Sequence, residues 1–101
     1  MKPDGVEFSR VVAEIVRQIP SGYVISYGDL AALAGFPSHA RLAGRTLASI
    51  GMDSDVPCHR VVNASGRTAP HWLAQRARLE AEGVRFKPNG CVDMRLCRWK
   101  W

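Results

Sequence analysis

The segment from residue 26 to about residue 50 restricts the possible folds of this chain most strongly, because two short helical patterns flank a tight turn. Ser26 precedes Asp29 by three residues, which is the spacing of a capping box at a helix start. The apolar positions that follow predict a helix over 27–34. The Gly35-Phe36-Pro37 turn then ends this first helix.

The second helix of the pair is expected to start at a Ser38 cap and to run to about Ser49. It carries Arg41 and Arg45 and no acidic residue, as a helix that faces nucleic acid should. Small side chains would let the two helices approach closely: Ala31, Ala40, Ala43 and Gly44. The pattern favours a helix-turn-helix, but any small helical hairpin shares it, and a solvated basic face is the alternative for the arginines.

The rest of the chain predicts a mainly α fold with small β elements. Residues 7–18 place apolar side chains at helical spacing, with Arg10, Glu14 and Arg17 on the opposite face. Further expected elements are a short strand at 23–25, an active-site loop at about 56–62, a helix at 71–82 between Pro70 and Gly83, a hairpin of 84–86 with 91–94, and a basic-aromatic tail at 95–101. The length of 101 residues fits one domain over the whole chain.

The charge balance favours a polyanionic partner. The net charge is +5, and 11 of the 14 cationic residues are arginine. Arginine binds phosphate through a planar, forked set of donors, so this composition suits nucleic acid. A basic protein without such a partner is an equally good interpretation of charge alone.

The cysteines indicate a reducing compartment. Cys58, Cys91 and Cys97 form an odd set, and the sequence shows no signal peptide and no long apolar run. We therefore expect a cytoplasmic, nucleoid-associated monomer without disulfides and without membrane contact. No pair has the short spacing of a zinc site, so no metal and no cofactor are expected.

The densest cluster of reactive residue types is Pro57-Cys58-His59-Arg60-Val61. A cysteine is a strong nucleophile only as thiolate, so it needs a base or a positive field nearby. His59 would point away from Cys58 on a regular strand, and the two cooperate only if the backbone turns or a water bridges them. Glu82 is a candidate to orient the imidazole. By itself a Cys-His dipeptide more often marks a buried structural cysteine beside a hydrogen-bonded histidine.

The order and spacing of several motifs resemble the O6-alkylguanine-DNA alkyltransferases. Pro57-Cys58-His59-Arg60-Val61 resembles the active-site motif of that family, and this motif is highly specific. The resemblance covers roughly residues 6 to 86 and includes Ile19-Pro20-x-Gly22, Ser26-Tyr27-Gly28-Asp29-Leu30-Ala31, Ala40-Arg41 with Gly44, and Glu80-Ala81-Glu82-Gly83-Val84. It implies a winged helix-turn-helix-like fold, the fold of the alkyltransferase C-terminal domain.

The resemblance also implies how the chain would act on DNA. The helix-turn-helix would enter the minor groove, and the damaged nucleotide would be flipped out of the duplex. Arg41 would fill the vacated stack, and Tyr27 would crowd the phosphate of the flipped nucleotide and donate a proton to the departing guanine. Arg45 and Arg67 would contact the backbone. For Tyr27 and Arg41 the plainer alternatives are a ring packed beneath the helix and a simple phosphate contact.

The implied chemistry is a single alkyl transfer to Cys58. His59 would take the thiol proton through a water, Glu82 would hold the imidazole, and Arg60 would brace the loop from behind. The implied pocket consists of Pro57, Cys58, Arg60, Val61, His71 and Trp72. For His71 and Trp72 the alternative is helix capping or core packing.

The chain departs from the pattern of active alkyltransferases at Ile50 and in the segment 67–72, which leaves the choice between alkyl transfer and lesion marking open. The compact length and the tail resemble the alkyltransferase-like branch, whose members bind and flip alkylated guanine and mark it for nucleotide excision repair proteins. That branch usually has tryptophan where Cys58 stands. Ile50 replaces an asparagine of active members, and the segment 67–72 is shorter than in either branch. A plain helix-turn-helix regulator with inert Cys58 and a cysteine hydrolase are the alternative functions.

Overall fold

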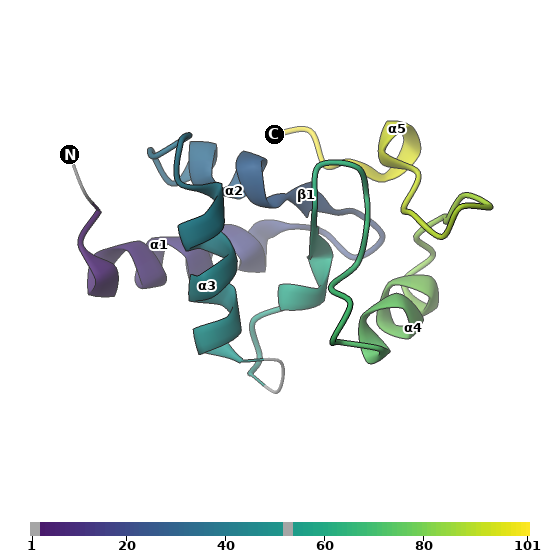
Figure 1. Cartoon of the computed structure of the whole chain (residues 1–101), viewed down its shortest axis with the longest axis horizontal. Helices are drawn as coiled ribbons and strands as arrows, with labels where there is room; N and C mark the ends of the chain where they lie inside the picture. The colour runs from purple at the N-terminus through teal and green to yellow at the C-terminus, as the bar shows by residue number, and fades with distance from the viewer. Residues whose placement is uncertain (1–2, 52–53) are drawn as a thin grey trace.

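The computed structural model describes residues 3–51 and 54–101. Helices dominate, as predicted, and the β structure is a two-stranded sheet (Figure 1). The elements in chain order are α1 (Gly5–Gln18), β1 (Ile25–Ser26), α2 (Tyr27–Leu33), α3 (Ala40–Ile50), the 3-10 helix η1 (Cys58–Arg60), β2 (Val61–Val62), α4 (Ala74–Ala81) and α5 (Met94–Cys97).

The start of α2 follows the predicted capping box. The backbone N–H of Asp29 donates to Ser26 Oγ at 3.0 Å, and the N–H of Ser26 donates to Asp29 Oδ2 at 3.1 Å. The helix ends before Gly35, whose φ of 92° lies in the left-handed region that glycine tolerates. Local chemistry therefore fixes both ends of the first helix of the helix-turn-helix.

The start of α3 differs from the prediction. The helix begins at Ala40 after a His39 cap position, and the Ser38 hydroxyl instead shares a 3.2 Å hydrogen bond with His39 Nδ1. The N–H of His39 donates to Phe36 O at 2.9 Å, which forms a tight turn and delays the helix by about one residue. Gly44 faces α2: a Cβ atom there would lie 3.7 Å from the ring of Tyr27. The expected close approach of the two helices is confirmed at this position.

The small sheet joins the helix-turn-helix to the segment that carries Cys58. β1 and β2 pair in parallel, with Ile25 opposite Val61 and Ser26 opposite Val62. Val24, one residue earlier, pairs with Arg98 of the tail, so the predicted strand at 23–25 is shifted by one residue. In Figure 1, α1–α3 lie at one end of the molecule and α4 and α5 at the other, with β1 between them.

The C-terminal third is less regular than predicted. α4 begins at Ala74 rather than at 71, because the preceding residues form a turn in which the N–H of Trp72 donates to Ala69 O at 3.1 Å. The hairpin is reduced to a bridge between Phe86 and Val92. Residues 94–97 coil into α5, so the segment 95–101 is an extended tail only from Arg98 onward.

Two observations limit the possible roles of the described residues. No helix in this part of the chain is both long enough and apolar enough to cross a membrane. Over 3–51 and 54–101, no group of three or more His, Cys, Asp or Glu side chains is placed to hold a metal ion.

Candidate functional site

The backbone turns at Cys58. The N–H of Cys58 donates to Val56 O at 2.7 Å, and the N–H of Arg60 donates to Pro57 O at 3.0 Å. These bonds form the single turn of η1 where a regular strand would have placed consecutive side chains on opposite faces. The turn meets the condition that sequence reasoning set for cooperation between Cys58 and His59.

Cys58 lines a pocket of about 140 Å³ although only 6% of the residue is exposed. α2 and α3 supply one side, and the segment 69–72 with α4 supplies the other. The lining residues are Tyr27, Gly44, Leu47, Ala48, Cys58, Ala69, His71, Trp72 and Gln75. The segment 69–72 is hereafter called the pocket wall.

The cavity includes only some of the residues that were predicted to form the pocket. Cys58, His71 and Trp72 line the cavity. Val61 instead lies in the core with 1% exposure, because it belongs to β2 and pairs with Ile25. Arg60 points to Glu82 and to the carboxyl end of α1, and half-buried Pro57 precedes the turn. The predictions of Pro57, Arg60 and Val61 as pocket residues are therefore wrong.

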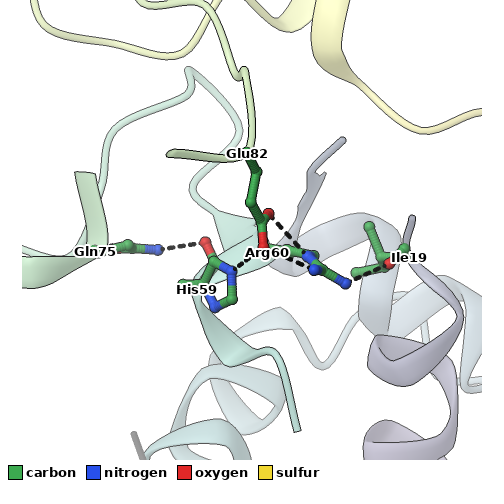
Figure 2. A network of polar contacts seen from close by, with 5 residues as sticks. All are labelled: Ile19, His59, Arg60, Gln75 and Glu82. Carbon is green, nitrogen blue, oxygen red and sulfur yellow. Dashed lines mark hydrogen bonds and ion pairs between the residues drawn. The ribbon is translucent and has the colours of Figure 1, made fainter. Parts of the chain in front are cut away.

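Glu82 connects His59 and Arg60 (Figure 2). His59 Nε2 lies 2.9 Å from Glu82 Oε2, and because an ionised carboxylate only accepts, this nitrogen is the donor. Arg60 donates to both carboxylate oxygens, through Nε at 3.0 Å and Nη2 at 2.7 Å. Arg60 Nη1 also donates to Ile19 O at 2.8 Å. The network fixes the imidazole and ties the Cys58 turn to the end of α1.

The carboxylate of Glu82 stays ionised over a wide pH range. Burial by itself would raise its pKa, but hydrogen bonds from Arg60 and His59, together with their charges, outweigh burial and lower the pKa from 4.5 to about 2. An ionised Glu82 can hold the imidazole of His59 in one orientation.

The thiol of Cys58 is neutral in the free protein. Burial raises its pKa above 9.0, and Sγ makes a long contact of 3.9 Å with Gly51 O. Burial also raises the pKa of Tyr27 above 10.0, with a further contribution from Cys58. The pocket therefore presents a protonated thiol and a protonated phenol, and a nucleophilic reaction would need to remove the thiol proton.

The basic face of α3 adjoins this pocket. Arg41 and Arg45 are exposed and line an open hollow of about 480 Å³ together with Tyr27, Ala40, Gly44 and Ala48. Tyr27, Gly44 and Ala48 line both the hollow and the Cys58 pocket. Arg67 lies apart from both, in a turn where its N–H donates to Asn63 Oδ1 at 2.8 Å.

Sequence reasoning missed two residues that organise the site. Gln75 is 1% exposed and lines the pocket. Its position one helical turn before buried Leu79 is the signal that could have placed it on the inner face of α4. Asp29 was predicted only as a capping residue, but its carboxylate also accepts from Arg98 Nη2 at 2.6 Å. The tail is thereby bound to the start of α2.

The chain is similar to several proteins of related function. Residues 7–84 match the family described as 6-O-methylguanine DNA methyltransferase, DNA binding domain. A DNA base-flipping protein of Escherichia coli (strain K12) is 43% identical over 97 residues, which cover 93% of this chain and 75% of that protein. A methylated-DNA–protein-cysteine methyltransferase of Methanopyrus kandleri is 43% identical over 77 residues, and the match spans 74% of this chain and 57% of that protein.

The fold leads to the same group of proteins. The crystal structure of S. pombe Atl1 in complex with damaged DNA containing O6-carboxymethylguanine matches with a TM-score of 0.84 and 31% identity over 100% of both chains. Relatives thus include proteins named for methyl transfer and proteins named for base flipping or as alkyltransferase-like. The chain belongs to the 6-O-methylguanine DNA methyltransferase family, whose DNA-binding domain it contains.

Proposed function

We propose that this protein binds duplex DNA containing O6-alkylguanine and takes the flipped base into the pocket beside Cys58. The observation that carries the proposal is the continuity between the basic face of α3 and the pocket, which share Tyr27, Gly44 and Ala48. A base that leaves the duplex beside α3 would reach the sulfur without crossing another element. Arg45 would hold a phosphate beside the opening.

Small residues on α3 favour close approach to the duplex. Gly44 and Ala48 are the α3 residues that line both the hollow and the pocket, so α3 itself puts no long side chain at the entrance between them. Flipping a base costs a few kcal/mol, and the cost is least for a damaged or mispaired base. Arg41, which is exposed at the second position of α3, would fill the gap left in the stack.

The similar proteins support this proposal. The E. coli relative is named for base flipping, and the S. pombe structure holds DNA with an O6-alkylated guanine. The likeness to that structure extends over the full length of this chain. Nucleotide excision repair proteins stay candidate partners from the sequence resemblance.

We further propose that Cys58 accepts the alkyl group. The Cys58 thiol would lose its proton to His59 through a water, and Sγ would form a bond to the alkyl carbon as the bond from that carbon to O6 breaks. The electron pair would stay on guanine, which would take a proton from the Tyr27 hydroxyl. Support comes from a thiol that lines the pocket and from an imidazole held by ionised Glu82.

Binding to matched duplexes tests the lesion-recognition step. A gel shift would compare one duplex with O6-methylguanine against the same duplex with guanine, at a fixed salt concentration. We expect tighter binding to the damaged duplex. Equal affinities, together with a preference for particular base sequences, would identify a plain helix-turn-helix module instead.

Arg41→Ala is expected to reduce the preference for damaged DNA about tenfold while overall affinity falls less. The guanidinium would fill the space left by the flipped base, and an alanine cannot. Competition gel shifts with damaged and undamaged duplexes measure both quantities. Equal losses on the two duplexes would contradict a role of Arg41 in flipping.

Arg45→Ala is expected to weaken binding to both duplexes by a similar factor. Arg45 lies one helical turn after Arg41 and is exposed on the same hollow, where it would neutralise a phosphate. The slope of log K against log salt should become shallower by about 0.9. A change in lesion preference without a change in this slope would assign Arg45 to base recognition.

A further inference from the structure

Gln75 is the most completely buried polar side chain near the pocket. Only 1% of the residue is exposed, yet it lies on α4, whose other residues mostly face solvent. A buried amide is stable only if its donors and acceptor are hydrogen-bonded. The partners of Gln75 therefore show what this side chain holds in place.

These partners belong to two separate segments of the pocket. Gln75 Nε2 donates to His59 O at 3.1 Å and to Val61 O at 3.0 Å (Figure 2 shows the bond to His59). Both carbonyls belong to the segment 59–61, which follows Cys58 in the chain. Gln75 Oε1 accepts from the N–H of Ala69 at 2.7 Å. One amide thus links the Cys58 turn to the first residue of the pocket wall.

Within residues 3–51 and 54–101, the other backbone hydrogen bonds of the pocket wall are local. The N–H of Trp72 donates to Ala69 O, and the N–H of Gln75 donates to Trp72 O, each at 3.1 Å. The guanidinium of Arg78 lies 5.4 Å from the centroid of the Trp72 ring. These contacts shape the wall and join it to α4, but they do not reach the Cys58 turn. Pro70 has no N–H to contribute.

We infer that Gln75 is a positioning residue that fixes the pocket wall relative to Cys58 and thereby limits the size of the O6-alkyl group that the pocket admits. The inference rests on the proposed recognition of O6-alkylguanine. Ala69 and His71 line the pocket of about 140 Å³, so a displacement of these two residues would change which substituents fit. A buried and fully bonded amide resists such displacement.

Gln75→Met tests the inference because methionine has a similar length and neither donates nor accepts as an amide does. The measured quantity is the affinity for a duplex with O6-benzylguanine divided by that for a duplex with O6-methylguanine. We expect this ratio to rise about tenfold relative to wild type. Glu80→Gln is the matched control, since Glu80 is an exposed residue of α4 that faces away from the pocket, and it should leave the ratio unchanged.

Amide hydrogen exchange at Ala69 provides a readout that a general loss of stability would not reproduce. In Gln75→Met the Ala69 N–H loses its acceptor and should exchange at least about tenfold faster, while amides inside α1 keep their protection. Gln75→Glu retains an oxygen for Ala69 and removes the donors to His59 and Val61. It should keep the Ala69 protection but raise the ratio as Gln75→Met does, because the wall is then no longer bonded to the Cys58 turn.

The outcomes separate this inference from the proposed function. A folded Gln75→Met protein that has the wild-type ratio, or that still protects Ala69, overturns the inference. If Gln75→Met does not fold, Ala69→Pro takes its place, because proline lacks the N–H that donates to Gln75 Oε1. An unchanged benzyl-to-methyl affinity ratio in Ala69→Pro also overturns the inference. If the wild-type protein binds neither lesion more tightly than guanine, the proposed function is contradicted instead. The hydrogen-exchange rate of the Ala69 amide then still shows whether Gln75 holds the pocket wall.

Discussion

Wild-type protein incubated with duplex DNA that carries radiolabelled O6-methylguanine is expected to retain about one label per molecule, and Cys58→Ser is expected to retain none. The sulfur of Cys58 lines the pocket and would form a stable thioether on displacing guanine. A serine hydroxyl has nearly the same size but is a far weaker nucleophile at neutral pH. Intact mass before and after incubation measures the transfer independently of the label.

Cys91→Ser is the matched control for this experiment. Cys91 is also a buried free cysteine, but it lies outside the residues that line the Cys58 pocket. The variant should accept label as wild type does. Tight binding of wild type to the damaged duplex without any label on the protein would contradict transfer and would identify a lesion-marking protein.

The rate of label transfer should increase from pH 7 to about pH 9. Burial raises the pKa of Cys58, so the neutral thiol predominates at pH 7 and the reactive thiolate becomes more abundant as the pH rises. The pKa of Tyr27 is also raised by burial, so its hydroxyl keeps the proton that guanine needs over the same range. Single-turnover rates measured with saturating DNA separate this effect from weaker binding.

The elements that sequence predicted well are those with local causes. The capping box of α2 depends on two residues three positions apart, and its hydrogen bonds are as expected. The turn at Gly35 needs a positive φ that glycine supplies by itself. The prediction of a helix-turn-helix therefore needed no knowledge of the remaining chain.

The proximity of His59 and Glu82 was predicted for a different reason. The two residues are 23 positions apart, and the prediction came from their chemical types and from the position of Glu82 near the end of the following helix. The contact is present, whereas the catalytic roles of Cys58, His59, Glu82 and Tyr27 stay predictions. The resemblance implied that Arg60 braces the loop from behind, but sequence could not name its partners Ile19 and Glu82, because these meet only in the folded chain.

The pocket wall shows the limit of sequence reasoning most clearly. Pro70 and Gly83 as end signals placed 71–73 in a helix, but in the structure the N–H of Trp72 donates to Ala69 O and these residues form a turn. The bond between Ala69 and Gln75 requires α4 to be packed already against the Cys58 turn. Such bonds depend on tertiary packing, which overrides the local helical preference.

Glu82→Gln is expected to lower the free energy of unfolding by about 2–3 kcal/mol, the largest effect on stability among these variants. The substitution removes the charge that Arg60 and His59 share, and it leaves the guanidinium of Arg60 largely buried with one fewer ionic partner. Melting temperatures should fall by roughly 10 °C or more. Urea unfolding at pH 7 gives the free energy directly.

Glu80→Gln is the matched control on the same helix. Glu80 is about half exposed and pairs with Arg76 at 3.5 Å, so its loss should change the free energy of unfolding by no more than about 0.5 kcal/mol. Comparable losses for the two variants would mean that the His59–Glu82–Arg60 network contributes no more than a surface ion pair.

The stability difference between wild type and Glu82→Gln should itself depend on pH. The pKa of Glu82 is lowered in the folded protein from 4.5 to about 2, so ionised Glu82 stabilises the fold fully above pH 4.5. This stabilisation is lost as the pH falls from 4.5 toward 2, because the unfolded chain takes up the proton first. The difference in free energy of unfolding between the two proteins should therefore be constant from pH 7 to pH 5. It should decrease by about 2 kcal/mol between pH 5 and pH 3. Urea unfolding of both proteins between pH 7 and pH 3 measures it. A difference that stays constant down to pH 3 would show that the charge of Glu82 is not what stabilises the Cys58 turn.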